Sequence, residues 1–330
     1  MGVVHSSAVR DTETQTLSIS EDLRARIWWS LWCEPGDGEV GELIGHFGAP
    51  EAARRIQHAV KHGVGRSSAS HHEHHQRMQM LIARLPEIPT RSRVDQVIDV
   101  CVREGIRPTT PSDSEWPHAL DDLGPFQPIL VFSRGELAHI SRREELVSVV
   151  GTRRPSVGGA RAAHAVSQAL LDQGLTIVSG GALGIDAIAH RTAVSRLRPT
   201  VVVGATGLDR HYPREHSGLF DAVARGGVLL SENPPGKPIS PRSFLSRNRI
   251  IAALASAVVV VECPTRSGAL STASHAATLG RELYAVSYEH TRPENEGAQR
   301  LFDEWNATPI VFSGGGTPSE VLAARQELRV

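Results

Sequence analysis

Residues 146–154, LVSVVGTRR, and residues 176–186, TIVSGGALGID, decide the fold. Each stretch joins a short apolar run rich in β-branched side chains to a glycine-containing turn, and a helical pattern follows each turn. This order of strand, turn and helix is typical of a parallel sheet whose two faces are both covered by helices. The pattern predicts an α/β domain, and ligands of such sheets bind at the carboxyl ends of the strands.

The same alternation continues through the rest of the chain. Strands are expected over residues 146–150, 176–179, 200–203, 228–231, 257–261, 282–286 and 309–312. Helices are expected between them, over residues 159–173, 186–195, 215–225, 244–254, 271–279 and 297–304. We therefore predict an extended Rossmann-like parallel sheet domain over residues 141–313.

Upstream of the sheet the apolar spacing is helical. A small helical domain is predicted over residues 22–104, with helices at 23–32, 40–47, 49–61 and 73–85. Residues 105–140 are rich in proline and lack periodicity, which predicts an irregular connector. Residues 1–21 and 314–330 are interpreted as terminal tails, the first of them disordered.

Composition narrows the functional classes. The 330 residues carry 35 Lys plus Arg against 36 Asp plus Glu, a formal net charge of -1, which argues against a globally basic protein that coats DNA. Only Lys61 and Lys237 are lysines, so any anion site is built mostly from arginine, a side chain suited to bidentate phosphate contacts. Aromatic residues make up 5% of the chain, too few for a surface paved with base-stacking rings.

The chain shows no sign of export or membrane insertion. Its longest nearly apolar run, residues 250–261, is too short to span a bilayer, and the polar first 21 residues lack the apolar core of a secretory signal. Its three cysteines are far apart and form no CxxC pair, so neither a disulfide framework nor a zinc ribbon is supported. We expect a soluble cytoplasmic protein.

Two neighbouring strand ends carry the residues of an anion site. The first strand ends in Gly151, Thr152 and Arg153, and the second in a loop that contains Ser179, Gly180, Gly181 and Gly184. Glycines let backbone N–H groups approach a phosphate, and an arginine beside them can clamp the same anion. No GxGxxG fingerprint opens a helix after the first strand and no GxxxxGK[ST] loop is present, which opposes a dinucleotide or nucleoside triphosphate site.

The stretch from Asn233 to Val261 contains no acidic residue. It supplies a ring, an amide and cations, the parts that hold a nucleotide by stacking, base-edge bonding and phosphate charge: Lys237, Arg242, Phe244, Arg247 and Asn248. Ser267 and Gly268, before a later helix, add candidate phosphate donors. The alternative interpretation places Phe244 in the core and the arginines in solvent.

Taken in order, these segments resemble the DprA/Smf family of DNA-processing proteins. The matching pieces are Gly151-Thr152-Arg153, Ser179-Gly180 with Gly184-Ile185-Asp186, Gly207-Leu208-Asp209 with Tyr212-Pro213, Ser231-Glu232, Phe244 with Arg247-Asn248-Arg249, and Glu262 with Ser267-Gly268. The helices around Pro35-Gly36-Asp37-Gly38 and Phe47-Gly48 are similar to the family's SAM-like or helix-hairpin-helix domain.

The resemblance implies a protein that binds single-stranded DNA without catalysis, cofactor or metal. It also implies protection of incoming DNA in natural transformation, loading of the RecA recombinase and a homodimer. Arg153, the Ser179–Gly184 loop, Phe244, Arg247 and Asn248 would line the DNA pocket, and Lys237 and Arg242 are added from local charge alone. Leu183 departs from a position that is often basic, and the chain is expected to lack the winged-helix domain of many relatives.

Other functions remain open at this point. Residues 313–317, SGGGT, with Glu320 are faintly similar to a loop of nucleoside-monophosphate glycohydrolases, in which case Glu232 or Glu262 would assist N-glycosidic cleavage. Asp209 with Glu232 could form a catalytic carboxylate pair, and a nucleotide sensor is a further alternative. The histidines around His58, His62 and residues 71–75 invite a metal interpretation, but a solvated histidine-rich helix start is favoured.

Overall fold

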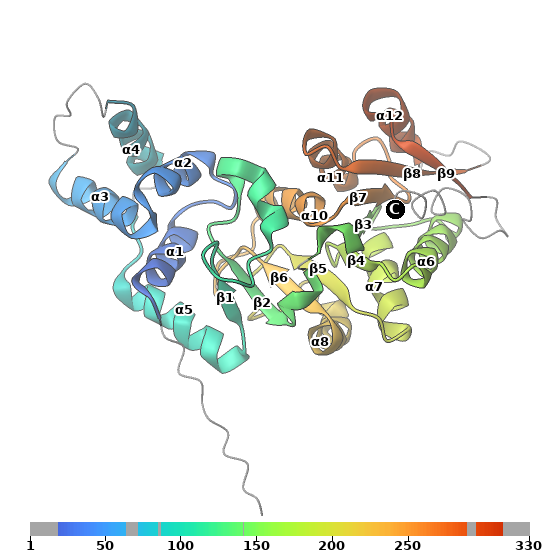
Figure 1. Cartoon of the computed structure of the whole chain (residues 1–330), viewed down its shortest axis with the longest axis horizontal. Helices are drawn as coiled ribbons and strands as arrows, with labels where there is room; N and C mark the ends of the chain where they lie inside the picture. Colours follow the sequence, from blue (N-terminus) through green and yellow to red (C-terminus); the bar gives the residue numbers. More distant parts are fainter. Residues whose placement is uncertain (1–18, 64–71, 85–86, 141, 289–294, 313–330) are drawn as a thin grey trace, which may run out of the picture.

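The computed structural model describes residues 19–63, 72–84, 87–140, 142–288 and 295–312. A helical part formed by the N-terminal third packs against one end of a larger part built on a single sheet (Figure 1). Both expected fold classes, the helical domain and the Rossmann-like sheet, are confirmed. Within these described ranges, no helix is both long and apolar enough to cross a membrane.

The helical part contains five helices among the described residues: α1 (Glu21–Trp32), α2 (Gly38–Phe47), α3 (Ala49–His62), α4 (His72–Arg84) and α5 (Arg91–Glu104). The four that the spacing predicts are confirmed to within a few residues, and α5 was not singled out. Capping sets the boundaries, because Ser20 accepts a bond from the Leu23 N–H at the start of α1 and the Asp37 side chain caps α2. Indole rings fill the core, with Trp29 fully buried.

The sheet has nine described strands in the order β1-β2-β6-β5-β4-β3-β7-β8-β9. The strands from β3 onward are mutually parallel and lie where the sequence predicts, within two residues at each end. Their bounds are β3 (Leu146–Val150), β4 (Thr176–Ser179), β5 (Thr200–Gly204), β6 (Val228–Ser231), β7 (Ala257–Val260), β8 (Glu282–Tyr288) and β9 (Thr308–Phe312). The order reverses at β3, so β4 and β7 flank it on opposite sides.

The expectation of an irregular connector over residues 105–140 is wrong for two stretches. β1 (Arg107–Thr109) and β2 (Val131–Gly135) extend the sheet beyond β6, and both of their pairings are antiparallel. Between them lies a 3-10 segment, η2 (His118–Phe126), which packs against α2 and α10. These strands are short and their segment is rich in proline, so no run was long enough to show a period of two.

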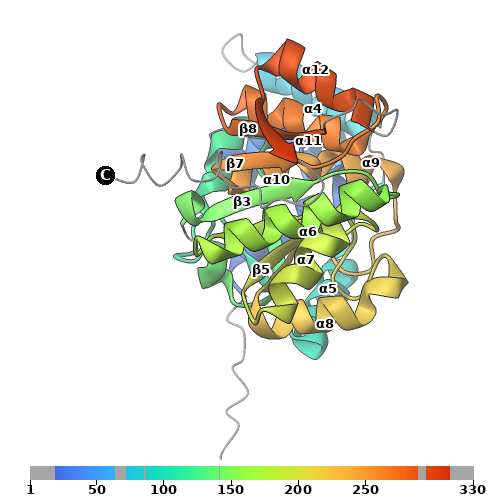
Figure 2. The same ribbon diagram turned by 90° about the vertical axis from the view of Figure 1, so that its right-hand side faces the viewer.

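Helices cover both faces of the sheet. α6 (Val157–Asp172), α7 (Ile185–Ser195) and α8 (Ser217–Gly226) form the layer that faces the viewer in Figure 2. The opposite layer contains α10 (Asn248–Leu254), α11 (Gly268–Thr278) and α12 (Glu296–Trp305). Successive residues of β5 point to opposite faces of the sheet. Val201 and Val203 pack with α10 residues, whereas Val202 packs in a cluster with residues of α1 and α8.

Buried polar contacts join the helical part to the sheet. The Arg249 guanidinium donates to Glu232 Oε1 at 2.7 Å and to the Phe126 carbonyl at 2.8 Å, and Glu232 also accepts from the Gly36 N–H. The Glu232 and Arg249 side chains are 8% and 6% exposed. The pair lies within the sheet part, where breaking it from one side would be strongly destabilising, and the Gly36 N–H reaches Glu232 from the helical part at 3.3 Å.

Candidate nucleic-acid interface

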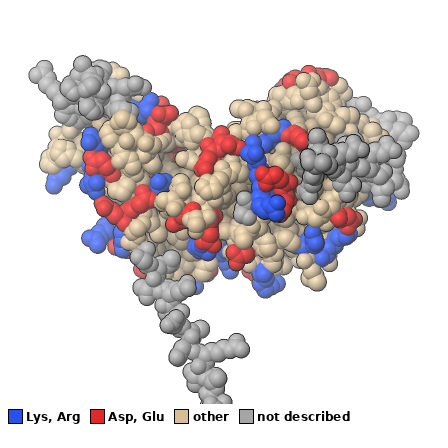
Figure 3. Space-filling view, viewed as in Figure 1, with Lys and Arg blue, Asp and Glu red and all other residues tan. Residues whose placement is uncertain are grey.

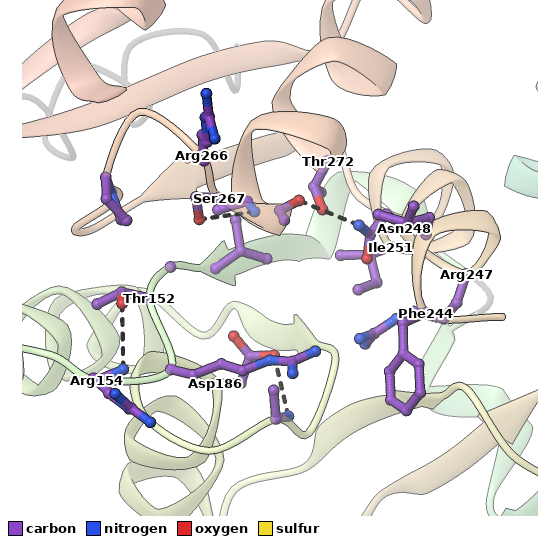
Figure 4. A pocket seen from close by; sticks show the side chains of 18 residues that line it. Thr152, Arg154, Asp186, Phe244, Arg247, Asn248, Ile251, Arg266, Ser267 and Thr272 are labelled. Atoms are coloured by element: carbon purple, nitrogen blue, oxygen red, sulfur yellow. Dashed lines mark hydrogen bonds between the residues drawn. The ribbon is translucent and has the colours of Figure 1, made fainter. Parts of the chain in front are cut away.

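A cavity of about 360 Å³ opens at the carboxyl ends of β3, β4 and β7. Figure 4 shows its walls: the turn after β3 with Thr152 and Arg154, the start of α7 with Asp186, the α9–α10 junction with Phe244 and Arg247, and the turn before α11 with Arg266 and Ser267. This is the place that the switch in strand order predicts for a ligand.

The turn after β3 depends on glycine. A Cβ added to Gly151 would lie 2.6 Å from Ile185 Cγ1 and 2.9 Å from the Glu262 carbonyl oxygen. The Thr152 N–H donates to that same carbonyl at 2.7 Å, and the Thr152 carbonyl accepts the Ile185 N–H at 3.1 Å. The main chain of the turn is therefore held from two sides, while Arg153 and Arg154 remain exposed at the mouth of the cavity.

Arg247 is the most deeply placed cation of the cavity. Its Nη1 donates to the Val203 carbonyl at 2.9 Å, the residue is 7% exposed, and its buried Nε has no hydrogen-bond partner among the described residues. Burial lowers the pKa of Arg247 to about 10, an effect that the Asp186 carboxylate opposes, so the guanidinium stays charged at neutral pH. Burial likewise raises the pKa of Asp186, against the influence of Arg247.

The glycines of the second strand end make room for this arginine. A Cβ on Gly180 would lie only 1.6 Å from Arg247 Nη1. Gly184 has a φ of 84°, and a Cβ there would lie 2.3 Å from the Thr152 carbonyl oxygen. These residues were predicted to let a phosphate approach, whereas in the structure they let protein groups approach, and Gly180 alone of this loop's predicted residues borders a cavity.

Arg247 also marks a break that the sequence pattern did not show. The single helix expected over residues 244–254 is wrong, since the segment divides into α9 (Pro241–Ser246) and α10, with Arg247 at the junction. The break turns Phe244 and Arg247 toward the same space, as Figure 4 shows. Asn248 begins α10, and its Nδ2 donates to the Gly268 carbonyl at 3.2 Å, which ties α10 to the turn before α11.

A pair of aromatic rings stands at the mouth of the cavity. The Phe244 and Tyr212 ring centroids are 5.3 Å apart, and Tyr212 is 46% exposed. The Arg153 guanidinium lies 5.6 Å from the Phe244 centroid, within reach of a cation–π contact. A smaller recess of about 70 Å³ adjoins this point and is walled in part by Leu183. Tyr212 therefore adds a second ring beside Phe244.

Eight of the fourteen predicted site residues line the main cavity: Gly151, Thr152, Arg153, Phe244, Arg247, Asn248, Ser267 and Gly268. Gly180 borders the smaller recess. Three others are used inside the fold, because the Ser179 hydroxyl donates to the Val149 carbonyl, Gly181 approaches Phe220, and Gly184 supports the turn after β3.

The two cations added from local charge lie elsewhere. Lys237 Nζ donates to the carbonyls of Ser30 and Cys33 at 3.3 and 2.9 Å, so it holds the end of α1 and does not face the cavity. Arg242 is exposed in the first turn of α9 and lines neither cavity. Arg154, Asp186, Tyr212 and Arg266 were not predicted. Arg154, Arg266 and Tyr212 are close in sequence to the segments already singled out, and this closeness could have identified them as candidates.

The acidic residues of the enzyme alternative are engaged in the fold. Glu232 pairs with Arg249, and Glu262 accepts the Ser156 N–H and hydroxyl at 2.9 and 2.5 Å, which fixes the start of α6. Asp209 pairs with Arg210 at 3.1 Å. The glycohydrolase-like loop at residues 313–317 lies outside the described part of the chain. The side chains of the histidine-rich residues 71–75 are also outside it, and the described residues contain no group of three side chains that could hold a metal ion.

Charge on the face seen in Figure 3 is mixed in sign. Lys and Arg side chains are intermingled there with Asp and Glu, in keeping with the net charge of -1. The cavity differs from this background, since four arginines and one acid, Asp186, line it.

The chain matches one protein family and several known proteins. A family model for the DNA recombination-mediator protein A matches residues 107–313. A putative DNA processing protein DprA from Mycobacterium tuberculosis is 34% identical over 295 residues, which cover 85% of this chain and 71% of that protein. The DNA processing protein DprA from Bacillus subtilis is 31% identical, over 66% of this chain and 74% of that protein.

Two solved structures share the fold. DNA processing protein A from Streptococcus pneumoniae superposes with a TM-score of 0.69 at 25% identity and covers 88% of this chain and 95% of its own. DNA processing protein A from Helicobacter pylori, described with a single-stranded DNA binding mode, gives a TM-score of 0.59 at 26% identity, over 67% of this chain and 96% of its own.

Proposed function

Because this chain belongs to the DNA recombination-mediator protein A family, we propose that its cavity at the carboxyl ends of β3, β4 and β7 binds single-stranded DNA. The observation that carries the proposal is the concentration of four arginines and the Phe244 ring around one opening, in a chain whose formal net charge is only -1. Guanidinium groups bind phosphates, and an exposed ring stacks on any base without reading its sequence.

The placement of these groups favours a single strand over a duplex. Arg247 is buried, and the Phe244 ring stands beside it at the cavity wall, so a base must leave its stack to contact the ring. Unpairing a duplex for this contact costs free energy, whereas a single strand presents unstacked bases. A binding preference for single strands follows.

The proposal extends to the role of the complex. We infer that the chain protects single-stranded DNA and promotes loading of the RecA recombinase in recombination and natural transformation, and that it acts as a homodimer. The family assignment and the DNA processing names of the relatives support this role. Binding without turnover is proposed because Glu232 and Glu262, the two acids considered for cleavage of a nucleotide, are bonded to Arg249 and Ser156.

Fluorescence anisotropy of a labelled oligonucleotide tests the proposal directly. The wild-type chain should bind single strands more tightly than duplexes of the same length, and raising the salt concentration should weaken binding, with a log–log slope near 0.7 per phosphate contacted. Arg153→Ala should weaken binding by about tenfold or more and reduce the slope, because an exposed phosphate contact is lost.

Arg191→Ala is the matched control. Arg191 is exposed on α7 and lines neither cavity, so its removal changes the net charge equally but leaves the site intact. Equal losses in the two variants would mean that binding is a property of the whole surface, and no loss in Arg153→Ala would place the site elsewhere. Release of a base from a nucleoside monophosphate, followed by chromatography, would support the enzyme alternative instead.

A further inference from the structure

A second groove lies at the opposite end of the parallel strands, where β5 and β6 begin. It has a volume of about 360 Å³ and is formed where α7 and α8 end and β5 and β6 begin, with Val194, Leu197, Arg198, Val223, Arg225 and Gly227 among its lining residues. The α7 and α8 helices that border it belong to the layer seen face-on in Figure 2. We name it the amino-edge groove. None of its lining residues borders the cavity at the carboxyl ends of β3, β4 and β7.

Leu197 is an unusual residue at the rim of this groove. Its side chain is 94% exposed, and its φ of 53° lies in the left-handed region that favours glycine. The hydrogen bonds of a helix end hold it there, since the Leu197 N–H donates to the Val194 carbonyl and the Arg198 N–H to the Ala193 carbonyl, both at 3.0 Å. A leucine here lowers stability in the free chain without any gain from burial, which points to a contact made with another molecule.

The charge of the groove selects the chemistry of that molecule. Arg198 and Arg225 line it and are exposed, and neither forms an ion pair with any described residue. No acidic residue lines the groove, and Val194 and Val223 supply apolar wall. A ligand that matches these features carries negative charge beside an aliphatic side chain.

We propose that the amino-edge groove binds an acidic peptide segment of a partner protein, with an aliphatic side chain of that segment packed against Leu197. The groove contains no aromatic ring on which a base could stack, which argues against single-stranded DNA as the occupant. A second copy is also disfavoured, because a two-fold contact through this groove would set Arg198 and Arg225 against the same arginines.

Leu197→Gly gives a test that separates binding from folding. Glycine suits a φ of 53°, so the thermal midpoint should rise, while loss of the side chain should weaken peptide binding by roughly tenfold. The probe is a short fluorescein-labelled peptide in which a pair of leucines is flanked by aspartates, followed by anisotropy on the full chain. Arg225→Ala should weaken binding as well and lower its salt dependence.

Val102→Ala is the control, since Val102 is 57% exposed on α5, away from the groove. The proposal predicts full peptide binding in this control and in the presence of saturating single-stranded oligonucleotide. Equal binding by wild type and Leu197→Gly, or displacement of the peptide by the oligonucleotide, would overturn it. So would a self-associated wild type that Leu197→Gly converts to monomer in sedimentation, because the groove would then bind a second copy.

Discussion

Gly180→Ala tests whether the position of the Arg247 guanidinium, rather than its charge, creates the proposed DNA site. The φ of Gly180 lies outside the left-handed region, so alanine suits the backbone. Its Cβ, however, would lie 1.6 Å from Arg247 Nη1 and 2.4 Å from Arg247 Cζ. The variant therefore keeps every charge of the chain and moves one guanidinium.

The size of the effect follows from these distances. Ordinary van der Waals contact begins near 3.4 Å, so the Arg247 guanidinium must retreat by roughly 2 Å. A shift of that size breaks the 2.9 Å bond from Nη1 to the Val203 carbonyl. A charge-assisted hydrogen bond contributes about 1.5–3 kcal/mol, and comparable misplacement toward a phosphate should weaken single-stranded DNA binding by about tenfold to a hundredfold. The free energy of unfolding should fall by about 1–3 kcal/mol, as for other overpacked interiors.

The assay combines oligonucleotide anisotropy at two salt concentrations with urea denaturation of the same preparations. Gly218→Ala is the matched control, because an added Cβ at Gly218 in α8 meets nothing within 4 Å and should change stability by less than about 1 kcal/mol. A folded Gly180→Ala variant that binds with the affinity and salt dependence of Gly218→Ala would refute the reasoning, since Arg247 would then be free to move without consequence for the strand.

Three further outcomes are expected. Phe244→Ala should weaken single-stranded DNA binding by about 1–3 kcal/mol in the anisotropy assay while Phe244→Trp retains it; equal affinities for both would exclude stacking on this ring. Glu232→Gln should lower the free energy of unfolding by about 3–5 kcal/mol in urea, because the buried Arg249 charge loses its only paired carboxylate among the described residues, and a loss below about 1 kcal/mol would contradict that role. Burial lowers the pKa of His190 to about 3, from a usual value near 6.5. Between those two pH values the unfolded chain binds one more proton than the folded chain, so the free energy of unfolding falls by about 1.4 kcal/mol for each pH unit of acidification from about 6.5 down to about 3. His190→Gln should make the measured pH dependence shallower by one proton, and an unchanged slope would show that His190 is not the group responsible.

The sequence predicted the parallel part of the fold well because the physical signal there is strong. Each strand from β3 to β9 is a short, largely apolar run between helical patterns, and the residues of β3, β4, β6 and β7 are buried throughout, which leaves little freedom in their composition. The antiparallel strands β1 and β2 lack that signal, since three and five residues are too few to show a period of two. Their place in the sheet depends on pairing with β6, a contact distant in sequence.

Residue type pointed to the strand ends that border the cavity, but it did not separate residues that face the cavity from residues that support the fold. Lys237 and Arg247 look alike in sequence, as cations in a stretch without acids. In the structure Lys237 binds the carbonyls that end α1, and Arg247 faces the cavity because the chain breaks between α9 and α10. The charge of the segment predicts neither the contact of Lys237 with α1 nor the break between the two helices, because both depend on tertiary packing.

The neutral composition of the chain and a nucleic-acid site are compatible because the cavity arginines do not act through net charge. Arg247 is enclosed by Gly180, the Val203 carbonyl and Asp186, where water screens poorly and a bound phosphate would meet a fixed guanidinium. A surface of many mobile cations would bind more strongly at low salt and lose more affinity as salt is raised. A preorganised cavity with few phosphate contacts should instead give an affinity that depends weakly on salt and a large loss of affinity for each contacting residue that is changed. The Arg153→Ala and Gly180→Ala measurements distinguish these two patterns.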